Sequence, residues 1–271
     1  MAQLSALMNV MVQAALKAGR RLKRDFGEVE NLQVSVKGPA DFVSNADRQA
    51  EKIVYEELKK ARPKWGFLME EGGEEVGEDP QHRWIIDPLD GTTNFLHSIP
   101  HFAISIALES QGQLMAGLVY NPVSEELFTA ERGKGAFLND RRMRVANRKT
   151  LATSVIGTGI PHIGRPEHGK FILELAHLMG ETAGIRRSGA ASLDLAYVAS
   201  GRFDGFWEHG LAAWDVAAGM LLISEAGGFV SDLEGGQKIF QTGGILCGNE
   251  PIQKKLLAAL KTGRQRSHKS S

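Results

Sequence analysis

The chain has 271 residues, of which 42% are hydrophobic and 24% are charged, and its 32 basic residues balance its 32 acidic ones. A chain of this length and composition buries a substantial core as one domain or as two joined subdomains. Zero net charge argues against general affinity for nucleic acid or a membrane surface, which needs a basic excess. Cys247 is the single cysteine, which excludes an internal disulfide and favours a cytoplasmic location.

An amphipathic helix is expected at the start of the chain. Leu4, Met8, Met11, Ala15 and Ala18 recur at helical spacing, and a basic cluster follows them. This pattern is typical of a surface helix rather than of a signal peptide. No apolar run approaches the roughly 20 residues that a membrane span needs.

A second helix and a strand-rich half are expected next. Ser44 followed three residues later by Asp47 has the pattern of a helix N-cap, and Pro63 would end that helix. Five apolar runs are typical of strands: 84–86, 102–108, 114–119, 127–130 and 136–138. The second and third runs flank a Gln-Gly-Gln turn, which predicts an antiparallel hairpin.

From about residue 154 the pattern changes to strands that alternate with helices. Strands are expected at 155–156, 203–207, 229–230 and 245–247, and helices at 167–179, 191–199 and 213–226. The alternation predicts a layered α/β arrangement. We therefore expect an N-terminal subdomain at 1–147, a C-terminal subdomain at 148–262 and a disordered basic tail at 263–271.

Two carboxylates stand at the end of the first predicted strand, in the string DPLDGTTNF at residues 87–95. Unpaired charges are costly at the end of a buried strand, whereas hard cations such as Mg²⁺ select oxygen ligands. Gly91 permits a tight turn, and the backbone N–H groups after it would form an anion site at a helix start. A metal site beside an anion site indicates phosphoryl chemistry. A bare Asp-x-x-Asp would more commonly be an ordinary turn.

The whole string is more specific than a turn, because it resembles the signature of the inositol monophosphatase family. The acidic pair Glu70-Glu71 and the segment WDVAAG at 214–219 also resemble segments of that family, in order. Further matches lie at 133–137, 187–189 and 225–228, and the similarity covers roughly residues 5–260. Met69 departs from the family, which usually has glycine there, and it is expected to alter how Glu70 reaches the metal.

The resemblance implies a fold, an activity and a metal set. The fold is the αβαβα sugar-phosphatase sandwich, usually a homodimer, and the activity is that of a magnesium-dependent phosphomonoesterase inhibited by lithium. Two or three Mg²⁺ ions are implied per site, and most of their ligands come from the N-terminal subdomain. The implied metal ligands are Glu70, Asp87, the Leu89 carbonyl, Asp90 and Asp215.

The resemblance also assigns catalytic and substrate contacts. Thr92, helped by Asp47, would orient the attacking water, and Glu70 would support a third, weaker ion. The implied substrate-binding residues are Asp90, Gly91, Thr92, Ala191, Glu208 and Asp215.

Several of these residues have plainer interpretations. Glu70 could belong to a solvated acidic turn, Asp47 could only cap its helix, and Asp215 could only face a helix dipole. Glu208 could pair with Arg202 or another cation. The eight histidines form no ligand set by spacing, and His97 and His101 are interpreted as loop or packing residues.

The function expected first is hydrolysis of myo-inositol phosphate to myo-inositol and phosphate by a metal-activated water. A sibling phosphatase acting on fructose bisphosphate, histidinol phosphate or a 3′-phosphonucleotide is the nearest alternative. A regulatory protein that binds the transcription machinery is an alternative of another class. The intact carboxylate set favours an enzyme, and no membrane or nucleic-acid partner is expected.

Overall fold

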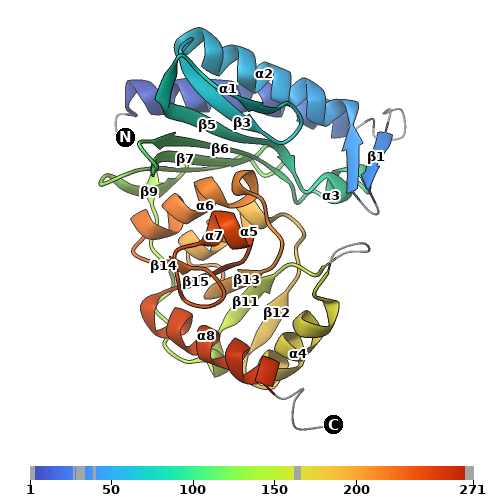
Figure 1. The fold of residues 1–271 in the computed structure, drawn as a ribbon, viewed down its shortest axis with the longest axis vertical. Helices are drawn as coiled ribbons and strands as arrows, with labels where there is room; N and C mark the ends of the chain where they lie inside the picture. Colours follow the sequence, from blue (N-terminus) through green and yellow to red (C-terminus); the bar gives the residue numbers. More distant parts are fainter. Residues whose placement is uncertain (1–3, 27, 29–33, 39–40, 162–165, 266–271) are drawn as a thin grey trace.

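The computed structural model describes residues 4–26, 28, 34–38, 41–161 and 166–265. Helices and sheets alternate in five stacked layers, from α1 and α2 at the top of Figure 1 to α8 and α4 at the bottom. This arrangement confirms the expected αβαβα sandwich. None of the described helices is long and apolar enough to cross a bilayer.

The first two layers are a helix pair and an eight-stranded sheet. The helices are α1 (Ala6–Phe26) and α2 (Asn45–Ala61), and a hairpin of β1 (Val34–Gly38) and β2 (Asp41–Ser44) joins them. The sheet has the order β10-β9-β8-β7-β6-β5-β3-β4. Its strands are β3 (Trp65–Met69), β4 (Gly73–Glu75), β5 (Asp79–Asp90), β6 (Ala103–Ser110), β7 (Gln113–Asn121), β8 (Glu126–Glu131), β9 (Gly135–Leu138) and β10 (Arg141–Arg142).

The other three layers are formed by the second half of the chain. Helices α5 (Ala191–Ala199) and α6 (Ala213–Glu225) lie between the two sheets. The second sheet has the order β12-β11-β13-β15-β14. Its strands are β11 (Val155–Thr158), β12 (Gly184–Arg186), β13 (Gly205–Glu208), β14 (Phe229–Ser231) and β15 (Ile245–Gly248). The outer helices are α4 (His168–Met179) and α8 (Glu250–Gln265). Three short helices lie in the connections between these elements: α3 (Thr92–Leu96) after β5, η2 (Leu151–Thr153) before β11, and α7 (Ile239–Thr242) before β15.

Side-chain alternation along the strands divides the core into three clusters. Phe67 and Ile86 pack with α1 and α2, whereas Leu68 and Ile85 pack in the cluster that contains α5 and α6. A third cluster lies between the second sheet and helices α4 and α8. The middle cluster takes residues from both halves of the chain, so the proposed boundary at 147/148 separates two parts that share one core.

Two features at the C-terminal side differ from the sequence-based expectations. Helix α8 was not expected, although Ile252, Leu256 and Leu260 are buried at helical spacing. This helix continues to Gln265, so the boundary placed at residue 262 is three residues too early. Residues 266–271 of the expected tail lie outside the described part of the chain.

The middle helix layer depends on one close approach, which generates a stability prediction. A Cβ atom at Gly219 of α6 would lie 2.5 Å from Cβ and 2.6 Å from Cδ1 of Leu195 in α5. Alanine gains about 1 kcal/mol of helix propensity over glycine, but overpacking a core costs about 1–3 kcal/mol. We therefore expect Gly219→Ala to lower the free energy of unfolding by up to about 2 kcal/mol.

Thermal unfolding checks this prediction, with Ser224→Ala as the control. Ser224 is exposed on the same helix, so that substitution tests helix propensity without the contact. An unfolding midpoint of Gly219→Ala at or above that of the wild type would contradict the close-packing account.

Candidate active site

A bulge near the end of β5 places two carboxylates on one face of the sheet. Asp87 pairs with Ser105 and Asp90 with Ala103, so three residue steps on β5 oppose two on β6. Residues three apart on a regular strand face opposite sides, and the extra residue reverses this parity. Ile86 and Leu89 accordingly both pack in the cluster beneath α1 and α2. The two aspartates therefore share the opposite face, toward α5 and α6.

Glu70 lies beside Asp87 at the end of the neighbouring strand. The Glu70 N–H donates to the Ile86 carbonyl, which continues the parallel pairing of β3 with β5 by one residue. Met69 is buried in the cluster beneath α1 and α2, and Glu70 follows it on the other face. The methionine side chain thus packs on the face of the sheet opposite to the carboxylates.

Asp215 comes to the same place from the second half of the chain. It lies in the first turn of α6, where its carboxylate accepts the Ala212 N–H at 2.6 Å. The buried Ser105 side chain donates to the Trp214 carbonyl at 3.2 Å, so the strand partner of Asp87 holds the start of α6. This contact fixes Asp215 against the first sheet.

These three aspartates form a group that fits a divalent cation. Oxygen atoms of Asp87, Asp90 and Asp215 all lie within 4.8 Å of one another. Burial raises the pKa of Asp87 well above its usual value, and the charges of Glu70, Asp90 and Asp215 raise it further. A set of oxygen ligands with mutual repulsion is what a hard cation such as Mg²⁺ or Mn²⁺ would neutralise.

Asp90 is also held by the start of α5. Its Oδ2 accepts the Ser192 hydroxyl at 2.6 Å and the Ser192 N–H at 2.7 Å, and its Oδ1 accepts the Ala191 N–H at 3.2 Å. Burial raises the pKa of Asp90 to about 6, even though the hydrogen bonds from Ser192 act in the opposite direction. The Ala191 N–H, proposed from the resemblance to lie near the substrate, donates to this metal-ligand candidate.

Thr92 and Asp47 meet as the sequence suggested. The Thr92 hydroxyl lies 3.0 Å from Asp47 Oδ1 and 3.1 Å from the Leu89 carbonyl oxygen. Asp47 is buried in the first turn of α2, so a helix-start position and a contact with Thr92 coexist. Gly91 precedes α3 in a left-handed conformation with φ of 96°, which lets the chain turn directly from Asp90 into the helix.

Glu208 ends β13 and faces the carboxylate group from the second sheet. A Cβ atom at position 159 would overlap its carboxyl group, so the glycine there leaves the space that Glu208 occupies. Burial raises the pKa of Glu208 well above its usual value, with Asp194, Asp215 and Asp90 adding to the effect. Arg202 instead pairs with Glu126, so it is not the partner of Glu208, but the charge of a second cation, Arg187, lowers the pKa of Glu208.

The residues that hold these side chains were missed by the sequence interpretation. Ser192 and Ser105 lie outside the recognised motifs, and their partners are 102 and 109 residues away. Asn94 lies inside the acidic string but had no role assigned, and its amide donates to the carbonyls of His101 and Ser188. The acidic string therefore contained a signal that could have pointed to Asn94, whereas no recognised motif contained one for Ser192 or Ser105.

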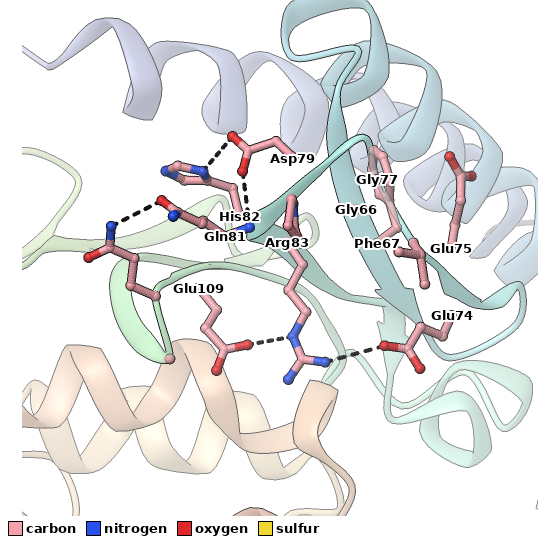
Figure 2. Close-up of a pocket in the computed structure, with 14 residues that line it drawn as sticks. Gly66, Phe67, Glu74, Glu75, Gly77, Asp79, Gln81, His82, Arg83 and Glu109 are labelled. Atoms are coloured by element: carbon pink, nitrogen blue, oxygen red, sulfur yellow. Dashed lines mark hydrogen bonds and ion pairs between the residues drawn. The ribbon is translucent and has the colours of Figure 1, made fainter.

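A second pocket, at the other end of β5, is a poor phosphate site. It has a volume of about 250 Å³, and Figure 2 shows Arg83 reaching between Glu109 and Glu74 within it. His82 similarly contacts Asp79 at 2.8 Å. The basic groups drawn there already have acidic partners, and Arg83 and Asp90 are separated by roughly 20 Å along the strand.

Comparisons with known proteins agree with the geometry. Residues 3–265 match the model of the inositol monophosphatase family. A Rhizobium meliloti protein named inositol-1-monophosphatase is 69% identical over 252 residues, which cover 93% of this chain and 95% of that protein. A Pseudomonas aeruginosa protein named Nus factor SuhB is 46% identical over 258 residues, which cover 94% of this chain and 95% of that protein.

A solved structure is similar along almost the whole chain. The crystal structure of extragenic suppressor protein suhB from Bartonella henselae has a TM-score of 0.94 and 66% sequence identity. The match covers 96% of this chain and 100% of that one.

The raised pKa values generate a prediction about cation binding and pH. Asp87 and Asp90 keep their protons to higher pH in the folded chain than in the unfolded chain, where aspartate titrates near about 4. Without a cation, the stability that these protonated carboxyl groups contribute to the folded chain is present below about pH 4. It is lost as pH rises through about 6. A divalent cation binds the ionised group, so we expect the rise in unfolding midpoint caused by Mg²⁺ to grow over the same range.

Thermal unfolding with and without Mg²⁺, at about pH 5 and about pH 7, checks this prediction. Asp215→Asn removes one candidate ligand and should flatten the response. A cation effect of equal size at both pH values would contradict the assignment.

Proposed function

Because the chain belongs to the inositol monophosphatase family, we propose that its substrate is an inositol phosphate, which it hydrolyses to myo-inositol and inorganic phosphate. The phosphomonoesterase class expected from the sequence is confirmed by the family match and by relatives named inositol-1-monophosphatase. Those names favour an inositol phosphate over the fructose, histidinol and nucleotide substrates considered first. The observation that carries the proposal is the group of Asp87, Asp90 and Asp215.

We propose Mg²⁺ as the metal and the following residues as its ligands: Glu70, Asp87, the Leu89 carbonyl, Asp90 and Asp215. Bound there, divalent cations favour the ionised form of a water and offset the charge that develops during phosphoryl transfer. The oxygen-only donor set supports a hard cation. Li⁺ is close to Mg²⁺ in size but carries half the charge, so we also propose inhibition by Li⁺, and activity unchanged in excess Li⁺ would argue against it.

Thr92 would orient the attacking water. A hydroxyl that donates its proton to Asp47 keeps its oxygen lone pairs as acceptors. Thr92 would therefore accept one hydrogen of the water and direct a lone pair of that water toward the phosphorus. Positioning of this kind lowers the entropic cost of bringing the reactants together.

The phosphate and the hydroxyl groups of the substrate would meet different elements. The backbone N–H groups of Gly91 and Thr92, where β5 turns into α3, would donate to phosphate oxygens. Glu208 would accept hydrogen bonds from substrate hydroxyls, since it faces the same site from the second sheet. Nearby cations would favour its ionised form and so oppose the effect of burial on its pKa.

A second function is suggested by the relative named Nus factor SuhB, which is similar over nearly the whole chain. On that observation we propose, as an additional role, binding to the transcription machinery. Surface contacts would carry such binding. We therefore expect Asp87→Asn to abolish hydrolysis while binding to the transcription machinery stays intact. Loss of both together would argue against a separate role.

On the family resemblance we further propose a homodimer in the cytoplasm. Cys247 is buried and burial raises its thiol pKa, which suits a structural cysteine in a reducing compartment. Light scattering of the purified protein tests the dimer, and the mass of a single chain would count against it.

The role of Glu208 generates a substrate-dependent prediction. A charged acceptor that meets a hydroxyl contributes about 1.5–3 kcal/mol, or roughly one to two decades in kcat/KM. We expect Glu208→Gln to lower kcat/KM for inositol 1-phosphate by that amount. The loss should be much smaller for p-nitrophenyl phosphate, which lacks the hydroxyls but uses the same metals.

The measurement is kcat/KM for both substrates in the wild type, Glu208→Gln and Glu181→Gln. Glu181 is an exposed carboxylate on the same half of the chain and serves as the matched control. Equal losses on both substrates in Glu208→Gln would assign this residue to the metal site or the fold instead.

A further inference from the structure

A buried carboxylate outside the active site binds both neighbours of Glu208. Glu174 of α4 has no exposed surface, and its Oε2 accepts the Trp207 indole N–H at 3.1 Å. The same oxygen lies 2.8 Å from Nε2 of His209. Its Oε1 accepts the Arg264 Nε–H at 2.6 Å, from the last turn of α8. One side chain therefore connects the end of β13 to both outer helices.

The charge of Glu174 is stabilised by these partners. Burial alone would raise the pKa of its carboxyl group, but hydrogen bonds from His209 and Arg264 outweigh burial and lower it. Hydrogen bonds to an ionised group are about twice as strong as neutral ones. Glu174 is thus a charged anchor inside an otherwise apolar cluster of α4, α8 and the second sheet.

Strand geometry connects this anchor to the active site. Side chains alternate along a strand, so Trp207 and the following His209 project toward the outer helices while Glu208 projects the other way. The packing agrees, because Trp207 belongs to the outer cluster and Phe206 to the middle cluster with α5 and α6. The two contacts on Glu174 hold the residues before and after Glu208.

The opposite side of Glu208 is held by close packing. Its carboxyl group occupies the space left by Gly159, and the Trp207 carbonyl accepts the hydroxyl of Thr158 at 2.9 Å. The end of β13 is therefore fixed from β11 as well as from α4. Figure 1 shows α4 and α8 together beneath the second sheet, of which β13 is the central strand.

We propose that Glu174, through His209 and Trp207, is a positioning residue that sets the Glu208 carboxylate against the substrate hydroxyls. The inference rests on the substrate contact proposed for Glu208. It adds a determinant of specificity on the outer face of the second sheet, which touches neither the metal ligands nor the reacting phosphate.

The test uses His209, because removing a buried charge at Glu174 risks misfolding. His209→Ala removes one contact to Glu174, and His209→Gln keeps an N–H donor. We expect His209→Ala to lower kcat/KM about fivefold for inositol 1-phosphate, mainly through KM, with little change for p-nitrophenyl phosphate. His209→Gln should recover most of this loss. In a Glu208→Gln background, His209→Ala should have no further effect, since the group it positions is gone.

The matched control is His177→Ala. His177 is a buried histidine of α4 whose Nε2 lies 3.2 Å from Oε1 of Glu181 rather than near the end of β13, so the ratio of the two activities should not change. If His209→Ala left the ratio of kcat/KM for inositol 1-phosphate to kcat/KM for p-nitrophenyl phosphate unchanged, this inference alone would be overturned. The same holds if the loss of kcat/KM in His209→Ala added fully to that in Glu208→Gln. An unchanged ratio in Glu208→Gln would instead overturn the substrate contact and this inference with it.

Discussion

Electrostatic repulsion among closely placed carboxylates is the constraint on which this structure depends. Asp87, Asp90 and Asp215 approach within 4.8 Å, and two of them are buried. Such a group opposes folding unless protons, donors or cations compensate it. The fold supplies donors at several points, including the start of α5 at Asp90 and the Leu89 N–H at Asp87. Positive charge from a metal would complete the compensation and is also what phosphoryl transfer requires.

The five-layer architecture brings these compensating groups together. Helices α5 and α6 lie between the sheets, and the first turn of α5 donates to Asp90 of β5, while that of α6 places Asp215 beside Asp87 and Asp90. Each helix packs in a core shared by both halves of the chain. A disturbance of the contact between α5 and α6 therefore moves ligands as well as core side chains. The site and the interior cannot be optimised independently, because the same two helices serve both.

Much of the fold was accessible from the sequence, because apolar periodicity predicts elements well where it is regular. The helix expected at 191–199 has those bounds in the structure, and the hairpin of β6 and β7 lies where it was expected. The ligand string was recognisable because its residues are adjacent. The contacts of Ser192, Ser105 and Glu174 were not, because they join residues 33 to 109 positions apart and no local pattern records them.

The bulge in β5 has a consequence for how the site can change over evolution. The facing of the two aspartates depends on the extra residue of the bulge, not only on the identity of the ligands. Regular pairing of this whole interval with β6 would keep every ligand in the sequence yet turn one carboxylate toward α1 and α2. A substitution that removed the bulge would therefore reorient a carboxylate without changing any acidic residue. The extra residue within the DPLD segment is thus part of the site, together with its acidic residues.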